Sequence, residues 1–264
     1  MQTIKNLQNI PICGNCLEVM NEIPDKSIDM ILCDLPYGTT ACKWDTIIPF
    51  DLLWSQYKRI VKDKGVIALF GSEPFSSYLR LSNIDWFKYD WIWDKVRPSG
   101  FQIAKYVPMK RHEIISIFSN GSKWYPQKEK RDKPVKGRVC SSSDSSPLKY
   151  NDGLVREYSD KNPQSILVFS KQSDGKYLHP TQKPQSLCEY LIKTYSLEDE
   201  LILDNCAGSF TTAVSCDNTR RNWICIEKED NYCQIGLERI NNNRIILNLP
   251  IINDYKCYAL ETFF

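Results

Sequence analysis

Apolar residues gather in short continuous runs along the chain, and stretches of mixed polarity separate these runs. Continuous apolar runs are typical of strands that helices cover on both faces, whereas apolar residues spaced three and four apart indicate helices. The runs predict strands at residues 28–33, 66–70, 89–93, 113–118, 166–169, 201–203 and 223–226. The helical spacing predicts helices at residues 49–62, 74–81, 185–195, 211–217 and 230–241. Strand and helix alternate, which favours an α/β, doubly wound and mostly parallel sheet.

The alternation stops between residues 120 and 174. This stretch is rich in Lys, Ser, Pro, Gly and Asp and poor in apolar residues, so it cannot bury much of a core. A long stretch of this kind inside a compact domain is usually functional or disordered. We therefore expect an inserted, partly mobile element, with residues 1–119 and 175–264 on either side of it.

The composition is that of an ordinary globular protein, with 42% hydrophobic and 25% charged residues among 264. No apolar run is long enough to predict a membrane span, and the N-terminal residues do not resemble a secretory signal. The eleven cysteines are odd in number and scattered through predicted strands and helices. This usage predicts reduced thiols and a cytoplasmic location instead of a disulfide framework.

One CxxC pair, Cys13 and Cys16, raises the question of a metal site. A structural zinc site needs a second such pair or a nearby pair of histidines. The two histidines, His112 and His179, are far apart in the sequence, and no second CxxC occurs. We therefore predict no metal site.

Charge is unevenly distributed although the formal net charge is only +2. Residues 95–138 carry twelve Lys or Arg against three acids, Glu113, Glu129 and Asp132. A basic stretch in a nearly neutral protein favours one surface that faces a polyanion. The alternative is a solvated loop with a bias towards lysine.

The predicted strand 28–33 ends in Asp34-Leu35-Pro36-Tyr37. In open α/β sheets, ligands bind outside the carboxyl ends of strands. A carboxylate and an aromatic ring at that position can hold a flat, hydrogen-bonding group such as a nucleobase. Taken alone, the same string is also compatible with an ordinary turn after a strand.

A second strand end carries the features of a nucleotide-type site. Residues 201–215 read LILDNCAGSFTTAVS, so an apolar strand ends at Asp204, a turn of small residues follows, and a helix begins near Thr211. Free N–H groups at a helix start suit such a ligand. Neither GxGxxG nor a Gly-Lys-Ser/Thr loop is present, so an adenosyl ligand without phosphates fits better. Glu227 ends the next predicted strand, where an acid commonly binds ribose hydroxyls.

Together these strings resemble the amino-group DNA methyltransferases, which form N6-methyladenine or N4-methylcytosine. The signature Asp/Asn/Ser-Pro-Pro-Tyr/Phe is matched by residues 34–37, and Asp-Pro-Phe-x-Gly-Ser-Gly-Thr-Thr is matched imperfectly by residues 204–212. Residues 179–184 (HPTQKP) and 14–18 (GNCLE) resemble two further family segments. Residues 34–37, which match the catalytic signature, precede residues 204–212, which match the cofactor signature. This order resembles the β class and the stand-alone methylases of phage and mobile elements.

The resemblance implies a Rossmann-like, seven-stranded fold of the class I S-adenosyl-L-methionine-dependent methyltransferases, circularly permuted, with a target-recognition insert at 120–174. It implies residues 1–119 as the catalytic half and residues 175–264 as the cofactor-binding half with a C-terminal tail. The reaction would be methyl transfer from S-adenosyl-L-methionine to N6 of a flipped adenine in double-stranded DNA. A homodimer is common in such enzymes, and the sequence leaves this state and a restriction endonuclease partner open.

By the same resemblance, Asp34 and the carbonyl of Leu35 or Pro36 accept the amino hydrogens, and Tyr37 stacks on the base. The cofactor side is assigned to Asn15, Cys16, Asp34, Thr181, Lys183, Asp204, Ala207, Gly208, Ser209, Thr211, Thr212 and Glu227. Phosphate contacts are expected from Lys95, Arg97, Lys105, Lys110 and Arg111.

Three positions depart from the family pattern. Leu35 replaces a proline, Asn15 replaces an acid, and Phe210 replaces a glycine beside the cofactor turn. We expect Phe210 to tighten that turn or narrow the site. Lys183 can also be an ordinary lysine at a helix start.

Alternative functions remain open from the sequence. An N4-cytosine methyltransferase differs only in the target base, and aspartate at position 34 favours adenine. An RNA substrate is a lesser alternative. A decayed methylase that only binds DNA is the main non-enzymatic reading, while the missing glycine fingerprint disfavours a nicotinamide dehydrogenase.

Overall fold

A computed structural model describes residues 2–38, 45–121, 123–140, 151–170 and 182–258. The chain divides into two compact units, one formed by Met1–Tyr125 with Ser165–Phe264 and the other by Pro126–Gln164. The second unit lies within the predicted insert of residues 120–174.

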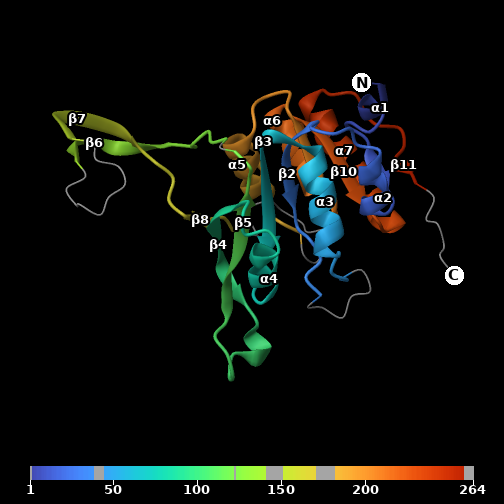
Figure 1. The fold of residues 1–264 in the computed structure, drawn as a ribbon, viewed down its shortest axis with the longest axis horizontal. Helices are drawn as coiled ribbons and strands as arrows, with labels where there is room; N and C mark the ends of the chain where they lie inside the picture. The colour runs from blue at the N-terminus through green and yellow to red at the C-terminus, as the bar shows by residue number, and fades with distance from the viewer. Residues whose placement is uncertain (1, 39–44, 122, 141–150, 171–181, 259–264) are drawn as a thin grey trace. The chain divides into compact units, whose positions relative to one another are not determined.

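The first unit is built on one nine-stranded sheet among the described residues, in the order β11-β1-β10-β9-β2-β3-β5-β4-β8 (Figure 1). Strand β5 is antiparallel to both of its neighbours, and the other pairs are parallel. The strands are β1 (Pro11–Cys13), β2 (Ile28–Cys33), β3 (Val61–Gly71), β4 (Phe87–Ser99), β5 (Lys110–Phe118), β8 (Ile166–Val168), β9 (Leu201–Asp204), β10 (Asn222–Glu227) and β11 (Lys256–Cys257).

All seven predicted strands are therefore present in one mostly parallel sheet. The predicted strand number is too low, because β1 and β11 add two more. These two strands span three and two residues, which is too short for a hydrophobic pattern to mark them.

Helices cover both faces of the sheet, which confirms the doubly wound arrangement (Figure 1). One core cluster joins the sheet to α5, α6 and α7, and a second joins it to α2, α3 and α4. Successive residues of β2 divide between them, with Met30 and Leu32 in the first cluster and Ile31 and Cys33 in the second. The helices are α1 (Gln2–Lys5), α2 (Cys16–Asn21), α3 (Phe50–Ile60), α4 (Phe75–Leu81), α5 (Gln185–Tyr195), α6 (Thr211–Thr219) and α7 (Asp230–Leu247).

Strands β2 and β9 lie side by side at the point where the strand order reverses. They pair in parallel, with Met30 opposite Ile202 and Ile31 opposite Leu203. From this pair the chain continues to β3 on one side and to β10 on the other. Such a switch point leaves a crevice at the carboxyl ends of the strands. Asp34 and Asp204 therefore stand at one edge of the sheet although 170 positions separate them in the sequence.

The second unit is a two-stranded antiparallel sheet of β6 (Glu129–Cys140) and β7 (Asn151–Lys161). The sequence predicted no regular structure here, because strongly charged strands that face water on both sides lack an apolar period. Most described side chains of the hairpin are exposed, in agreement with the small core expected of this stretch. Among the described residues, no helix is long and apolar enough to cross a membrane.

Phe210 does not line the cavity described below. Its backbone has φ +58°, a conformation that glycine adopts freely and that costs a bulky residue energy. Its ring is fully buried and packs over Gly236 in α7. The ring thus lies in the core, and the expectation of a narrower site is wrong because Phe210 is absent from the cavity lining.

Gly236→Ala is expected to destabilise the protein by about 1–3 kcal/mol. A Cβ at position 236 would lie 2.7 Å from Cε2 of Phe210, well inside van der Waals contact. The sign of the stability change is informative, because Gly→Ala inside a helix otherwise stabilises a protein by about 0.5–1 kcal/mol. Chemical denaturation measures the change, with Asn242→Ala at an exposed position of the same helix as control. Equal or greater stability of Gly236→Ala would contradict the packing.

Candidate active site

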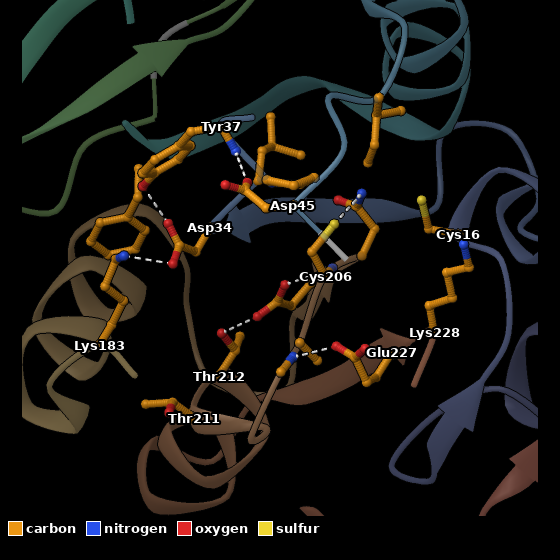
Figure 2. A pocket seen from close by; sticks show the side chains of 18 of the residues that line it. Cys16, Asp34, Tyr37, Asp45, Lys183, Cys206, Thr211, Thr212, Glu227 and Lys228 are labelled. Atoms are coloured by element: carbon orange, nitrogen blue, oxygen red, sulfur yellow. Dashed lines mark hydrogen bonds and ion pairs between the residues drawn. The ribbon is translucent and has the colours of Figure 1, made fainter. Parts of the chain in front are cut away.

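A cavity of about 560 Å³ opens at the carboxyl ends of β1, β2, β9 and β10 (Figure 2). It lies at the switch point of the sheet, where the two sequence signatures were predicted to meet. Among the predicted residues, the cavity is lined by Asn15, Cys16, Asp34, Leu35, Pro36, Tyr37, Lys183, Asp204, Ala207, Gly208, Ser209, Thr211, Thr212 and Glu227. Thr181 lies outside the described residues.

The turn after β2 fixes Asp34 and Tyr37 towards each other. The Tyr37 hydroxyl donates a hydrogen bond to Oδ1 of Asp34. The Tyr37 ring packs on Phe75, with ring centroids 5.0 Å apart. Buried Asp45 accepts hydrogen bonds from the backbone N–H of Tyr37 at 2.7 Å and of Gly38 at 2.9 Å. The side chain of Asp45, eight residues after Tyr37, thus holds the turn. The motif of residues 34–37 alone did not reveal this contact.

Lys183 joins two carboxylates in the wall of the cavity. Its Nζ lies 2.5 Å from Oδ2 of Asp34 (Figure 2). The same Nζ lies 3.3 Å from Oε2 of Glu113. Burial alone would lower the pKa of Lys183, but the negative charges of Asp34 and Glu113 outweigh burial and raise it. Lys183 therefore carries a positive charge, and its ammonium holds Asp34 in place from one side.

Glu113 is a site residue that sequence reasoning missed. It lies at the amino-terminal part of β5, lines the cavity, and also pairs with Nζ of Lys95 at 3.4 Å. The sequence offered one signal, an acid inside a predicted apolar strand. Its two lysine partners come from separate segments, so their convergence requires the folded sheet.

Asp204 is buried where β9 meets the turn of small residues. Its two oxygens accept hydrogen bonds from the Thr212 hydroxyl at 2.6 Å and the Cys206 backbone N–H at 3.1 Å. These bonds tie the end of the strand to the start of α6. Burial raises the pKa of Asp204 to about 6, although both hydrogen bonds act in the opposite direction.

Glu227 closes the other side of the same turn. Its Oε2 accepts the backbone N–H of Gly208 at 2.7 Å, and its Oε1 accepts the backbone N–H of Glu229 at 2.9 Å. Burial raises the pKa of Glu227. A carboxylate offers about four acceptor sites, more than the backbone N–H groups that Glu227 meets here, so acceptor capacity remains for a hydroxyl donor from a ligand in the cavity.

Asn15 and Cys16 form the rim contributed by the start of α2. The Asn15 side chain caps this helix by accepting the Leu17 backbone N–H at 3.0 Å. Cys16 forms a hydrogen bond with Cys206, which lowers the pKa of the Cys16 thiol. The helix start and the cofactor-type turn therefore meet through two cysteine side chains.

The five predicted phosphate-contacting residues fall into two environments. Lys95 and Lys110 line the cavity, whereas Arg97, Lys105 and Arg111 do not. Lys95 is only 6% exposed, because Glu113 and the Ser99 hydroxyl hold its ammonium. The other four are exposed, although Arg111 forms a two-pronged ion pair with Asp94. Phosphate contact by these residues stays a prediction.

One group of possible metal ligands occurs among the described residues. The ligand atoms of Cys13, Asp230 and Cys257 all lie within 4.8 Å of one another. Metals bind the thiolate, and burial raises the pKa of the Cys13 thiol, which disfavours that form. The absence of a metal site stays a prediction, and the second cysteine of the CxxC pair, Cys16, lines the cavity instead.

The sequence model of the DNA methylase family, whose name groups N6 and N4 enzymes, matches residues 28–238. The match includes both strand ends of the cavity and spans most of the chain. The chain therefore belongs to this family of amino-group DNA methyltransferases. The family defines the enzyme class and leaves the choice between adenine and cytosine unresolved.

Curated relatives extend the match over nearly the whole chain. The Type II methyltransferase M.HinfI of Haemophilus influenzae is 26% identical over 98% of this chain and 74% of its own. The DNA adenine methyltransferase YhdJ of Escherichia coli K12 is 25% identical over 87% of this chain and 82% of its own.

Solved structures show the same fold. The complex of M1.HpyAVI with SAM has a TM-score of 0.57 at 22% identity and covers 87% of this chain and 98% of its own. The cytosine-N4-specific PvuII DNA methyltransferase has a TM-score of 0.61 at 18% identity, covering 91% and 94%. The class I methyltransferase fold implied by the sequence signatures is therefore confirmed.

Asp204→Asn is expected to remove a pH-dependent cost to stability. Because the folded pKa of about 6 exceeds the usual 3.8, ionising Asp204 destabilises the folded protein as pH rises from about 4 to about 6. Between pH 4 and pH 7 the variant should gain at most about 3 kcal/mol on the natural protein in chemical denaturation. Thr212→Val, which removes a hydrogen bond to the ionised form, should move this window to higher pH. If the stabilities of Asp204→Asn and the natural protein change in parallel between pH 4 and pH 7, the raised pKa of Asp204 is contradicted.

Proposed function

We propose that this protein transfers a methyl group from S-adenosyl-L-methionine to the N6 amino group of an adenine in double-stranded DNA, at a specific sequence. The observation that carries this proposal is the single cavity shared by the Asp34-Leu35-Pro36-Tyr37 turn and the turn of residues 204–209. A base-holding turn and a nucleoside-type turn in one cavity suit transfer between two bound ligands.

The donor set of the cavity fits the proposed cofactor. Glu227 keeps acceptor capacity for a ribose diol, and the small residues Ala207 and Gly208 let a ligand approach the backbone closely. Asn15, Cys16, Asp204, Ser209, Thr211 and Thr212 would complete this side of the site. When bound, S-adenosyl-L-methionine supplies a methyl group on a positively charged sulfur.

Asp34 is the acceptor proposed for one hydrogen of the amino group. An exocyclic amino nitrogen is a poor nucleophile, because its lone pair is delocalised into the base. Hydrogen bonds to Asp34 and to the backbone carbonyl of Leu35 or Pro36 would return electron density to that nitrogen. The proton leaves through Asp34 or to solvent.

Lys183 and Glu113 act in this proposal as positioning residues. Lys183 holds one oxygen of Asp34 and so orients the carboxylate, while Glu113 anchors the ammonium of Lys183 from β5. Tyr37 shares the turn and offers its ring to the base; stacking of this kind contributes about 1–3 kcal/mol. Extrusion of the base from the duplex costs a few kcal/mol.

Aspartate at position 34 supports adenine as the target. The relatives include both a DNA adenine methyltransferase and a cytosine-N4-specific enzyme, so the family alone carries no preference. N4 of cytosine is the second candidate, because the same acceptors would serve its amino group. The well-formed cavity and its intact Asp34 and Glu227 favour an enzyme over a decayed binding protein.

Asp34→Ala is expected to lower methyl transfer to DNA by at least about 10³-fold, since it removes the amino-group acceptor. Transfer of tritiated methyl groups to mixed DNA measures the rate, and calorimetric titration measures cofactor affinity. Affinity should change far less than the rate. Asp51→Ala, at an exposed position in α3, is the matched control. If the unsubstituted protein binds the cofactor but transfers no methyl group, it is a decayed homologue and the proposed activity is refuted.

The modified nucleoside decides the target base. DNA from cells that express the protein, digested to nucleosides and analysed by mass spectrometry, should contain N6-methyladenine. N4-methylcytosine in place of it would refute the adenine assignment while leaving the enzyme class intact. Single-molecule sequencing of the same DNA should report the recognition sequence.

A further inference from the structure

The connection between β4 and β5 is an exposed apolar tip on a basic stem. The two strands extend past the neighbouring part of the sheet (Figure 1). Phe101 is 79% exposed and Tyr106 is 80% exposed, and Ile103 between them is 55% exposed. Large apolar side chains gathered on a surface mark an interaction site more often than chance. This tip, residues 100–107, takes no part in the site described above.

The tip is locally ordered, which suits a preformed contact element. Gly100 adopts φ +90° and starts a short helical turn at Phe101–Ile103. Backbone hydrogen bonds from the N–H of Ala104 to the carbonyl of Phe101, and from the N–H of Tyr106 to that of Ile103, fold the tip on itself. Phe101 and Tyr106 are therefore presented by a compact turn.

The charge around the tip identifies its partner as a polyanion. Residues 95–111 contain two arginines and three lysines and no acid, although Glu113 pairs with Lys95 and Asp94 pairs with Arg111. Arg97 and Lys105 are exposed and belong to this group. The tip therefore combines exposed cations with exposed aromatic rings. DNA matches both, because its phosphates attract the cations and its bases stack on aromatic rings.

The stem of the same hairpin reaches the active-site cavity. Ser99 and Lys110 pair across the stem, and both line the cavity. β4 carries extra residues between Asp94 and Ser99, where the register with β5 shifts. This bulge turns Lys95 into the cavity wall, beside Glu113. The tip thus begins where an extruded base would enter.

We propose that the tip enters the duplex at the step from which the target base is extruded, with Phe101 and Tyr106 stacking on the bases left behind. This inference rests on the proposed function. Apolar wedges of this kind lower the cost of opening a base step. The tip would therefore matter for extrusion and not for the methyl transfer that follows.

The double variant Phe101→Ala/Tyr106→Ala tests the wedge on two substrates. One is a short duplex with the sequence that the protein methylates, and the other is the same duplex with an abasic site opposite the target. On the paired duplex, kcat/KM should fall about ten- to a hundred-fold. On the abasic duplex, where the target is already unpaired, it should stay within about threefold.

A second measurement follows extrusion directly. With 2-aminopurine at the target position, the natural protein should raise the fluorescence of the paired duplex, and the double variant should raise it much less. Ile246→Ala, a 78% exposed apolar residue in α7, is the control and should behave as the natural protein.

Equal losses on the two duplexes would overturn the wedge and leave the tip as a simple binding surface. An unchanged kcat/KM on both duplexes would also overturn the wedge. So would a double variant that changes its oligomeric state but keeps the natural protein's ratio of rates on the two duplexes. Failure of the proposed function is distinct from these results, because the natural protein would then methylate neither duplex.

Discussion

The parallel pairing of β2 with β9 is the constraint on which the site depends. Hydrogen bonds between these strands place the start of one signature beside the start of the other. The cavity opens there because the chain continues from β2 to β3 on one side and from β9 to β10 on the other. Asp34 and Asp204 meet at this edge only if the register is kept. A slip by one residue would turn every side chain of β2 to the other face of the sheet.

Charge balance inside the cavity follows from that geometry. Lys183 bridges Asp34 and Glu113, and Glu113 in turn holds Lys95, so positive and negative groups alternate across the wall. A buried charge without a partner is costly, and each group here has one. The same arrangement keeps the Asp34 carboxylate oriented. The chemistry proposed for the family signature therefore relies on residues from β4 and β5 that belong to neither signature.

The sequence predicted the strands and helices that carry a clear period. Short apolar runs marked seven of the nine strands described in the central sheet, and amphipathic spacing marked the helices α3 to α7 but not α1 or α2. It missed β1 and β11, which are too short for a period, and the β6–β7 hairpin, whose strands face water on both sides. The two motifs located the two strand-end turns that line the cavity. Glu113 and Asp45 escaped, because their contacts join segments that no local pattern connects.

The sequence by itself determined the fold class and the two strand ends that form the site, since both depend on local patterns of apolar and polar residues. Tertiary structure decided which charges meet and which exposed residues border the cavity. It also decided the fate of Phe210, whose ring turns into the core over Gly236 and away from the ligand space. The physical reason is that pairing, burial and packing act between residues far apart in the chain, where only the folded backbone sets the distances.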